Sequence, residues 1–344
     1  MAVNLRIANW HCKYCPFWFA RFTDDIIYNF FLQLRACLWW KAIAGNDRTS
    51  PVYDYQLSYD LLPSVTRWIV NRRICRFYPR LHHANVEIRT AYLDKSVAKV
   101  INSIMNEQVY NATGIMEQKK INLIVMGGGY DTRSIKLLER SLLQNADIPH
   151  YELLKQKRQQ RTRWWNRREL GEPPLKNAFD NITSKDYDLE CFELDLPEVV
   201  RAKTQLLQTR LFKRRPWLQD IQSDYPQLNP VDFNNLNDTR SALESIILSD
   251  DTGNTNVHNI IIFEGVMIYL DEGVPHALLD ICSSILNKRK SQSSSYLCFA
   301  DRLENIPGGD EAAANLEMNS TGWKLIDWLP KPGLARHMGV ARLR

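Results

Sequence analysis

The sequence has no apolar run long enough to suggest a membrane-spanning helix. Its most apolar stretch near the N-terminus, Ile26–Trp40, is 15 residues long and includes Asn29, Gln33 and Arg35. A membrane span needs about 20 predominantly apolar residues. We therefore expect no membrane span, and we interpret this stretch as part of an amphipathic core helix.

Glycine and proline are not abundant, and internal repeats are missing. The 344 residues include 14 Gly and 15 Pro, with no visible repeat of the kind that builds solenoids or propellers. This composition excludes a collagen-like or low-complexity chain. With 44% apolar residues, the chain can form one or two folded domains.

A disulfide framework is also missing. The seven cysteines are odd in number and mostly scattered through apolar segments, which favours a reducing compartment and a cytoplasmic location. Cys12 and Cys15 form a Cys-x-x-Cys without a second Cys/His pair at the spacing of a zinc site, so we predict no metal. Residues 1–23 contain basic but no acidic residues, one property of an organelle transit peptide, but they lack its serine richness.

Charge is unevenly distributed. The formal net charge is +5, yet Lys155–Leu170 alone has seven basic residues and one acidic residue, so the rest of the chain is close to neutral. Within it, Lys155–Arg168 interleaves cations with two tryptophans, which would suit contacts with RNA phosphates and bases. We favour a solvated charged helix or loop, the usual form of such runs.

The apolar pattern changes from helical to alternating near residue 120. Spacing of three to four residues predicts helices over Asp24–Ala44, Leu61–Tyr78 and Val86–Tyr110. Further along, predicted strands alternate with helical stretches such as Pro197–Thr209, which indicates a parallel sheet covered on both faces. The predicted strands are Ile121–Met126, Glu190–Leu194, His258–Glu264, Ser295–Asp301, Trp323–Leu329 and His337–Leu343. The last two are spaced as an antiparallel hairpin at one sheet edge.

A glycine cluster follows the first predicted strand. In Gly127-Gly-Gly-Tyr-Asp-Thr132, the residues Gly127 and Gly129 would let the backbone approach a ligand closely. The third glycine of dinucleotide-binding loops is missing, which argues against NAD. The alternative is an ordinary tight turn in which Asp131 or Thr132 caps the following helix.

Acidic residues end several predicted strands. Glu193 and Asp195 are two residues apart and share a face, while Asp232 and Glu264 mark further strand ends. Ligands of open α/β sheets bind at the carboxyl ends of the strands. Together these acids indicate one ligand crevice, although the pair Glu193 and Asp195 alone would be read as two solvated charges.

Four ordered blocks in the chain resemble the leucine carboxyl methyltransferase family. They are Gly127–Thr132, Glu193–Lys203, Val231–Leu236 and Phe263–Leu270, and the resemblance extends from about residue 85 to the C-terminus. It implies an α/β, Rossmann-like class I methyltransferase with a seven-stranded, mostly parallel sheet, an antiparallel edge hairpin and a helical N-terminal lid. We expect residues 1–115 to form the helical region and 116–344 the cofactor-binding domain, with a basic insertion at about 150–188.

The resemblance also implies that S-adenosyl-L-methionine is the cofactor and suggests a role for each matching residue. Arg89 is expected to bind the methionine carboxylate and Glu264 to lie near the methionine amino group. Gly127 and Gly129 belong to the cofactor loop, and Asp195 is expected to hold the ribose. The remaining candidates are Glu193 as a second ribose ligand and Asp232 with Phe233 at the adenine.

Other interpretations stay open for two of these residues, and two family features are not found. Arg89 can be a helix-surface ion pair, and Phe233 a core residue that offers only its backbone. The lysine that the family places near the cofactor carboxylate has no recognisable counterpart in the N-terminal region. Residues after Asp301 show no match to the peptide-binding residues of members that methylate a phosphatase C-terminus.

The predicted function is methyl transfer to an oxygen, with a carboxylate on a protein C-terminus or a small molecule as the favoured acceptor. A carboxylate is ionised at pH 7, so we predict no proton-transfer residue. The alternatives are a small-molecule O-methyltransferase, a relative that modifies transfer RNA, and a degenerate methyltransferase fold that serves as a binding scaffold.

Overall fold

The computed structural model describes most of the chain after residue 36. The described residues are 37–45, 50, 52, 57–71, 80–107, 119–145, 178–182, 187–216, 218, 226–249, 256–289, 293–303, 310–329 and 337–344. The chain divides into two units, Met1–Ala36 and Cys37–Arg344, and all described residues belong to the second. The Cys-x-x-Cys, the transit-like segment and Lys155–Leu170 lie outside the described residues.

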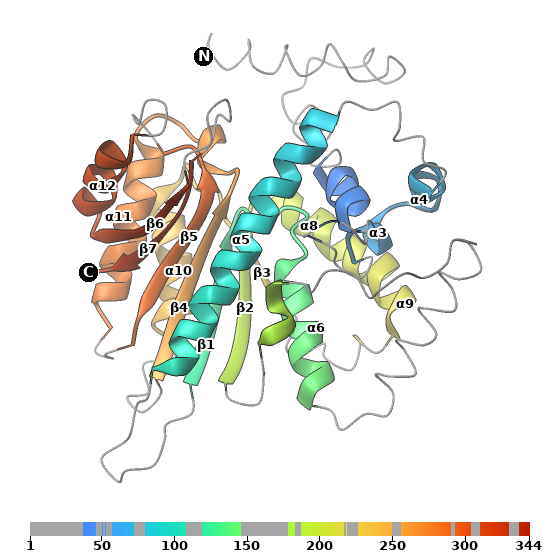
Figure 1. The fold of residues 1–344 in the computed structure, drawn as a ribbon, viewed down its shortest axis with the longest axis horizontal. Helices are drawn as coiled ribbons and strands as arrows, with labels where there is room; N and C mark the ends of the chain where they lie inside the picture. Colours follow the sequence, from blue (N-terminus) through green and yellow to red (C-terminus); the bar gives the residue numbers. More distant parts are fainter. Residues whose placement is uncertain are drawn as a thin grey trace. The chain divides into compact units, whose positions relative to one another are not determined.

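Seven strands form one sheet in the order β3-β2-β1-β4-β5-β7-β6 (Figure 1). β1 to β5 run parallel to one another, and β7 runs antiparallel to both β5 and β6. The strands are β1 (Lys119–Met126), β2 (Tyr187–Asp195), β3 (Gln227–Pro230), β4 (Asn256–Glu264), β5 (Ser295–Asp301), β6 (Trp323–Leu329) and β7 (His337–Leu343). This confirms the predicted mostly parallel sheet with an antiparallel hairpin at one edge.

The strand order reverses between β1 and β4. β1 pairs with β2 on one side and with β4 on the other, so the connections leave the carboxyl ends of these strands in opposite directions. In open α/β sheets such a switch point is where a ligand binds. The topology therefore predicts a ligand crevice above the ends of β1, β2 and β4.

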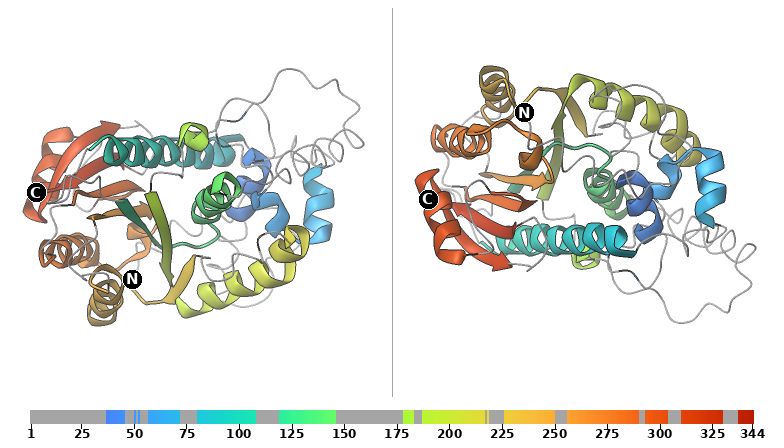
Figure 2. Two further views of the ribbon diagram at one scale, coloured as in Figure 1. Left: turned by 90° about the horizontal axis from the view of Figure 1, so that it is seen from below. Right: turned by 90° about the horizontal axis from the view of Figure 1, so that it is seen from above.

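Helices cover both faces of the sheet (Figure 2). Apolar residues of α5 (Arg80–Asn106) and α6 (Arg133–Asn145) pack on one face, and those of α10 (Leu236–Ile247), α11 (Val274–Asn287) and α12 (Glu311–Ser320) pack on the other. Successive strand residues alternate between these two cores, as the pleat requires. A sheet buried on both faces explains why its central strands read as continuous apolar runs.

Residues 37–45 are also helical. Other labelled helical elements of the described residues are α3 (Leu57–Leu61), α4 (Ser64–Asn71), η2 (Ala178–Asn181), α8 (Pro197–Leu206), η4 (Leu207–Leu211), α9 (Phe212–Arg214) and η6 (Met267–Tyr269). Pro197 lies in the first turn of α8, as predicted. The helix predicted over Leu61–Tyr78 begins later, at Ser64, because the chain breaks at Pro63 between α3 and α4. Its predicted end lies outside the described residues. Proline lacks an N–H and disfavours helical geometry in the residue before it.

Two further findings concern only the described part of the chain. None of its helices is long and apolar enough to cross a membrane. It also contains no group of three or more His, Cys, Asp or Glu side chains that could hold a metal ion.

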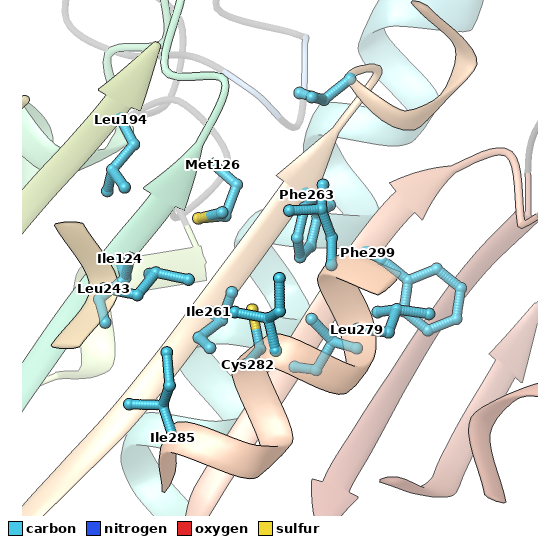
Figure 3. Packing of buried hydrophobic residues seen from close by; sticks show 14 of the residues in the cluster. Ile124, Met126, Leu194, Leu243, Ile261, Phe263, Leu279, Cys282, Ile285 and Phe299 are labelled. Carbon is cyan, nitrogen blue, oxygen red and sulfur yellow. The ribbon is translucent and has the colours of Figure 1, made fainter. Parts of the chain in front are cut away.

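Phe263 carries much of the packing next to the crevice. It is fully buried, pairs in register with Phe299 of β5, and lies in the core that β4 forms with α11 (Figure 3). The next residue, Glu264, ends the strand. The core therefore fixes the position from which the Glu264 side chain leaves the sheet.

We expect Phe263→Ala to lower the free energy of unfolding by about 3–5 kcal/mol, because it removes a buried aromatic ring and leaves a cavity. Urea denaturation would measure this change. Leu316→Ala is the control, since Leu316 is 72% exposed and its loss should cost less than about 0.5 kcal/mol. Equal effects of the two substitutions would contradict the assigned core.

Candidate functional site

The glycine loop after β1 is compressed between neighbouring segments. Gly127 and Gly129 have φ values of 70° and 41°, a region that favours glycine. A Cβ at Gly127 would lie 2.0 Å from Cγ2 of Val266, so a larger residue would force the backbone apart. The Gly127 N–H donates to the carbonyl oxygen of Leu194 at 2.7 Å. The loop is thereby fastened to the end of β2.

Asp195, the last residue of β2, binds the same loop. Its Oδ2 accepts a hydrogen bond from the Gly129 N–H at 2.7 Å, and its Oδ1 accepts one from the Leu196 N–H, also at 2.7 Å. Burial raises the pKa of Asp195, although both N–H donors favour the ionised form. A carboxylate has about four acceptor positions, so Asp195 retains capacity for a ligand hydroxyl.

Glu193 shares a face with Asp195 but lies deeper. It is only 2% exposed and forms an ion pair with Lys203 of α8. The two acids that the sequence groups together therefore have different surroundings. This geometry gives no support to Glu193 as a direct ribose ligand.

Asp232 and Phe233 follow β3 and point in different directions. Asp232 is exposed, and its Oδ1 accepts a hydrogen bond from the Asn234 N–H at 3.0 Å. Phe233 is 4% exposed and belongs to the core shared with α10 and α11. The interpretation of Phe233 as a core residue is confirmed for its side chain, which leaves its backbone for any ligand contact.

Glu264 is surrounded by three cations. Arg89 Nε donates to its Oε1 at 2.7 Å, Arg133 Nη2 donates to its Oε2 at 3.0 Å, and Lys41 Nζ lies 3.3 Å from the same Oε2. The Glu264 side chain is 5% exposed and that of Arg89 is 12% exposed. The interpretation of Arg89 as a helix-surface ion pair is therefore wrong, because its partner is buried at the end of the sheet.

The charges around Glu264 keep it ionised. Burial alone would raise its pKa, but Lys41, Arg89 and Arg133 outweigh this effect and hold the pKa well below its ordinary value. A carboxylate in this state binds cations well and is a poor general base.

Arg133 joins Glu264 to two further acids. Its side chain is 1% exposed; Nε donates to Asp94 at 2.7 Å, and Nη1 pairs with Asp131. Lys136 also pairs with Asp94, at 3.2 Å. These contacts define an ion cluster of four cations and three carboxylates: Lys41, Arg89, Arg133, Lys136, Asp94, Asp131 and Glu264.

Asp301 supports the segment that follows Glu264. It ends β5, is fully buried, and its Oδ2 accepts hydrogen bonds from the N–H groups of Val266 at 2.5 Å and Met267 at 2.9 Å. Val266 is the residue that faces Gly127. Asp301 thus fixes the wall against which the glycine loop packs.

The sequence reasoning missed Lys41, Arg133 and Asp301. Lys41 lies in the helical residues 37–45 without any motif around it, and only the family's expected lysine hinted at it. Arg133 directly follows the glycine motif, and Asp301 ends a predicted strand. The rule that selected the other strand-end acids would also have found Asp301.

A model of one protein family matches the chain. Residues 178–283 match "Leucine carboxyl methyltransferase". The family indicated by the sequence motifs is confirmed for this segment. It contains Glu193, Asp195, Asp232, Phe233 and Glu264, whereas Arg89 and the glycine loop lie before it. The match supports an S-adenosylmethionine-dependent methyltransferase, the enzyme class and cofactor that the motifs predict.

Similarity to other known proteins is weak. In sequence, no curated protein matches significantly. Among solved structures, the chain is similar to magnesium protoporphyrin IX methyltransferase from Synechocystis PCC 6803 with bound S-adenosylmethionine, with a TM-score of 0.37, 12% identity, and coverage of 83% of this chain and 97% of that chain. For mitomycin 7-O-methyltransferase the TM-score is 0.34, the identity 12%, and the coverage 91% and 67%. The methyltransferase fold is assigned from the strand order and not from these similarities.

The ion cluster makes the stability of this methyltransferase depend on Glu264. We expect Glu264→Gln to lower the free energy of unfolding at pH 7 by about 3–5 kcal/mol, because it leaves buried cations without their anion. Because the folded-state pKa of Glu264 is depressed, its stabilisation is present above the unfolded pKa of about 4.3 and is lost as pH falls toward the folded pKa.

Urea denaturation at several pH values would measure this dependence. The difference between wild type and Glu264→Gln should be constant from pH 6 to 8 and should narrow below about pH 4.5. Glu272→Gln is the control, since Glu272 is exposed. A difference that widens toward low pH would contradict the ionised state of Glu264.

Proposed function

We propose that this methyltransferase transfers the methyl group of S-adenosylmethionine to a carboxylate. The observation that carries the proposal is the set of polar groups at the carboxyl ends of adjacent strands. Asp195, the glycine loop and Glu264 end or follow β2, β1 and β4, which are adjacent strands. The crevice at the strand switch point thus has a polar group from each strand.

The residues present fit the cofactor. The backbone at Gly127 and Gly128 leaves no room for a Cβ, which is the kind of loop that can lie directly against a ligand. We assign the methionine carboxylate to Arg89, whose guanidinium can form two parallel hydrogen bonds, and the ammonium group to Glu264. Lys41, 3.3 Å from Glu264, is the counterpart of the family's cofactor lysine in this proposal.

The other end of the cofactor is assigned to the β2 and β3 side of the crevice. Asp195 would accept hydrogen bonds from the ribose hydroxyls. Asp232, exposed after β3, would accept one from the adenine amino group, with the Phe233 backbone beside it. The exposure of Asp232 and the free acceptor positions of Asp195 support these roles.

The charge at the methionine end of the site, away from Asp195 and Asp232, favours an anionic acceptor. At pH 7 the ion cluster holds four positive and three negative side chains, and S-adenosylmethionine itself has a net charge of +1. When bound, it supplies a methyl group on a positively charged sulfur, which an acceptor oxygen displaces. A surplus of positive charge attracts and orients a negatively charged nucleophile.

Two carboxylates of the cluster are poorly suited to the proton transfer that an alcohol acceptor would need. An alcohol must lose a proton to a base, whereas Asp131 and Glu264 both have lowered pKa values because cations outweigh the effect of their burial. Carboxylates with such pKa values are weak bases. A carboxylate acceptor is already ionised, so positioning and exclusion of water are sufficient.

Two further expectations, about the domain boundaries and the cellular location, belong to the same proposal. We assign residues 1–115 to the helical region and lid, and 116–344 to the cofactor-binding domain with its basic insertion. We also place the enzyme in the cytoplasm, which the free cysteines Cys37, Cys191, Cys282 and Cys298 support. The acceptor is a protein C-terminus or a small carboxylate.

Calorimetry with S-adenosylmethionine tests the cofactor site. Arg89→Ala and Asp195→Ala should each weaken binding by about tenfold or more, because each removes hydrogen bonds to or from a charged group. Arg201→Ala and Asp188→Asn are matched controls at exposed positions of α8 and β2 and should bind as wild type does. No binding by the folded wild-type protein would favour a binding scaffold and contradict the enzyme.

Labelling tests the acceptor. After incubation of a cell extract with enzyme and S-adenosylmethionine carrying a labelled methyl group, we expect label in protein or in small carboxylates that mild base releases, as an ester requires. Label confined to RNA would favour the transfer-RNA alternative, and base-stable label in small molecules would favour an O-methyltransferase that acts on alcohols. Either result would contradict the carboxylate proposal.

A further inference from the structure

A buried ion pair lies directly beneath the glycine loop. The side chains of Lys203 and Glu193 are each 2% exposed, and they pair with each other. Oε2 of Glu193 lies 2.7 Å from the place that a Cβ of Gly128 would occupy. The pair therefore packs against the backbone of the loop without taking part in the ion cluster around Glu264.

Lys203 also binds the loop itself. Besides Glu193, its ammonium group donates to the carbonyl oxygens of Asp131 at 2.8 Å and Gly128 at 3.4 Å. An ammonium group has three N–H donors, and these three acceptors use all of them. Lys203 thus connects α8 to both ends of the turn that follows Gly127.

The hydrogen bond to Gly128 fixes one peptide unit from both sides. In a trans peptide the C=O of one residue and the N–H of the next point in opposite directions. The C=O of Gly128 accepts hydrogen bonds from Lys203 at 3.4 Å and from the Asp131 N–H at 2.7 Å, and Asp195 accepts from the N–H of Gly129 at 2.7 Å. The peptide between these two glycines is therefore clamped between the ammonium group and the carboxylate.

Stability alone does not account for such a pair. Replacing a buried ion pair by well-packed apolar residues is often neutral or stabilising, because both charges must lose their hydration. Two apolar side chains of similar size could fill the same space, but they could not hold the two loop carbonyls.

We propose that Lys203, held by Glu193, is a positioning residue that orients the Gly128–Gly129 peptide and, through it, the Asp195 carboxylate for the cofactor ribose. The inference rests on the proposed function, since it assigns Asp195 to the ribose. Lys203 itself makes no contact with the ligand. It affects binding by orienting the peptide between Gly128 and Gly129.

The test compares Lys203→Met with the double variant Glu193→Leu/Lys203→Met. The single variant leaves a buried carboxylate without its partner, so it should be destabilised in urea denaturation. The double variant removes both charges and should recover much of that stability. Its affinity for S-adenosylhomocysteine, measured by calorimetry, should nevertheless stay about tenfold or more below that of wild type, since the carbonyl contacts are still missing.

A second readout isolates the ribose. Wild type should bind S-adenosylhomocysteine more tightly than its 2′-deoxy analogue, and this preference should shrink in the double variant as it does in Asp195→Ala. Arg201→Met is the control, because Arg201 is exposed on the same helix and should leave both the affinity and the preference unchanged. If Glu193→Leu/Lys203→Met does not fold, Glu193→Met/Lys203→Leu provides the same comparison.

The outcomes separate this inference from the proposed function. If wild type binds S-adenosylhomocysteine and a folded double variant binds it equally well with an unchanged preference, Lys203 has only a structural role and the inference is wrong. If folded wild type does not bind it, the proposed function fails and the inference fails with it. Reduced affinity together with a reduced preference supports the inference.

Discussion

Glu264 imposes the constraint on which the arrangement of the site depends. It places a carboxylate at the end of β4, whose other residues are all buried, and burial there penalises an uncompensated charge. The compensation comes from three separate segments: Lys41 in residues 37–45, Arg89 in α5 and Arg133 at the start of α6. Residues 37–45 and α5 are therefore connected to the sheet by the same ion pairs that shape the proposed methionine site.

The ion cluster and the Lys203–Glu193 pair beneath the glycine loop both use buried charged side chains to fix groups of the site. In the cluster, cations hold the charged state of an acid that is proposed to bind an ammonium group. Beneath the loop, Lys203 holds backbone carbonyls so that an N–H faces Asp195. Asp301 adds a third support, since its contacts with Val266 and Met267 fix the wall opposite Gly127. Buried charged residues around the crevice thus fix its shape as well as its charge.

Much of the fold was predictable from the sequence because parallel strands buried on both faces are continuous apolar runs with abrupt polar ends. This applies to β1, β4 and β5, and the strand-end acids Asp195 and Glu264 followed from the same pattern. The break at Pro63 was also readable from the sequence, yet helical spacing on both sides concealed it.

The contacts of the site were less predictable because they depend on packing between distant segments. Nothing local distinguishes Lys41 from a surface lysine, and only the fold brings it within 3.3 Å of a residue 223 positions away. Glu193 and Asp195 share a face, but their depths differ because α8 covers one of them with Lys203. The burial of Phe233 could be expected from its residue type, because phenylalanine side chains are usually buried.

The most direct test of the account is a crystal structure of the enzyme with S-adenosylhomocysteine. The account predicts the methionine carboxylate on Arg89 and the ammonium group on Glu264, the ribose hydroxyls on Asp195, and the adenine beside Asp232. It also predicts that Lys203 still holds the Gly128–Gly129 peptide. A ligand bound away from the ends of β1, β2 and β4, or one that leaves Asp195 and Arg89 without contact, would contradict it.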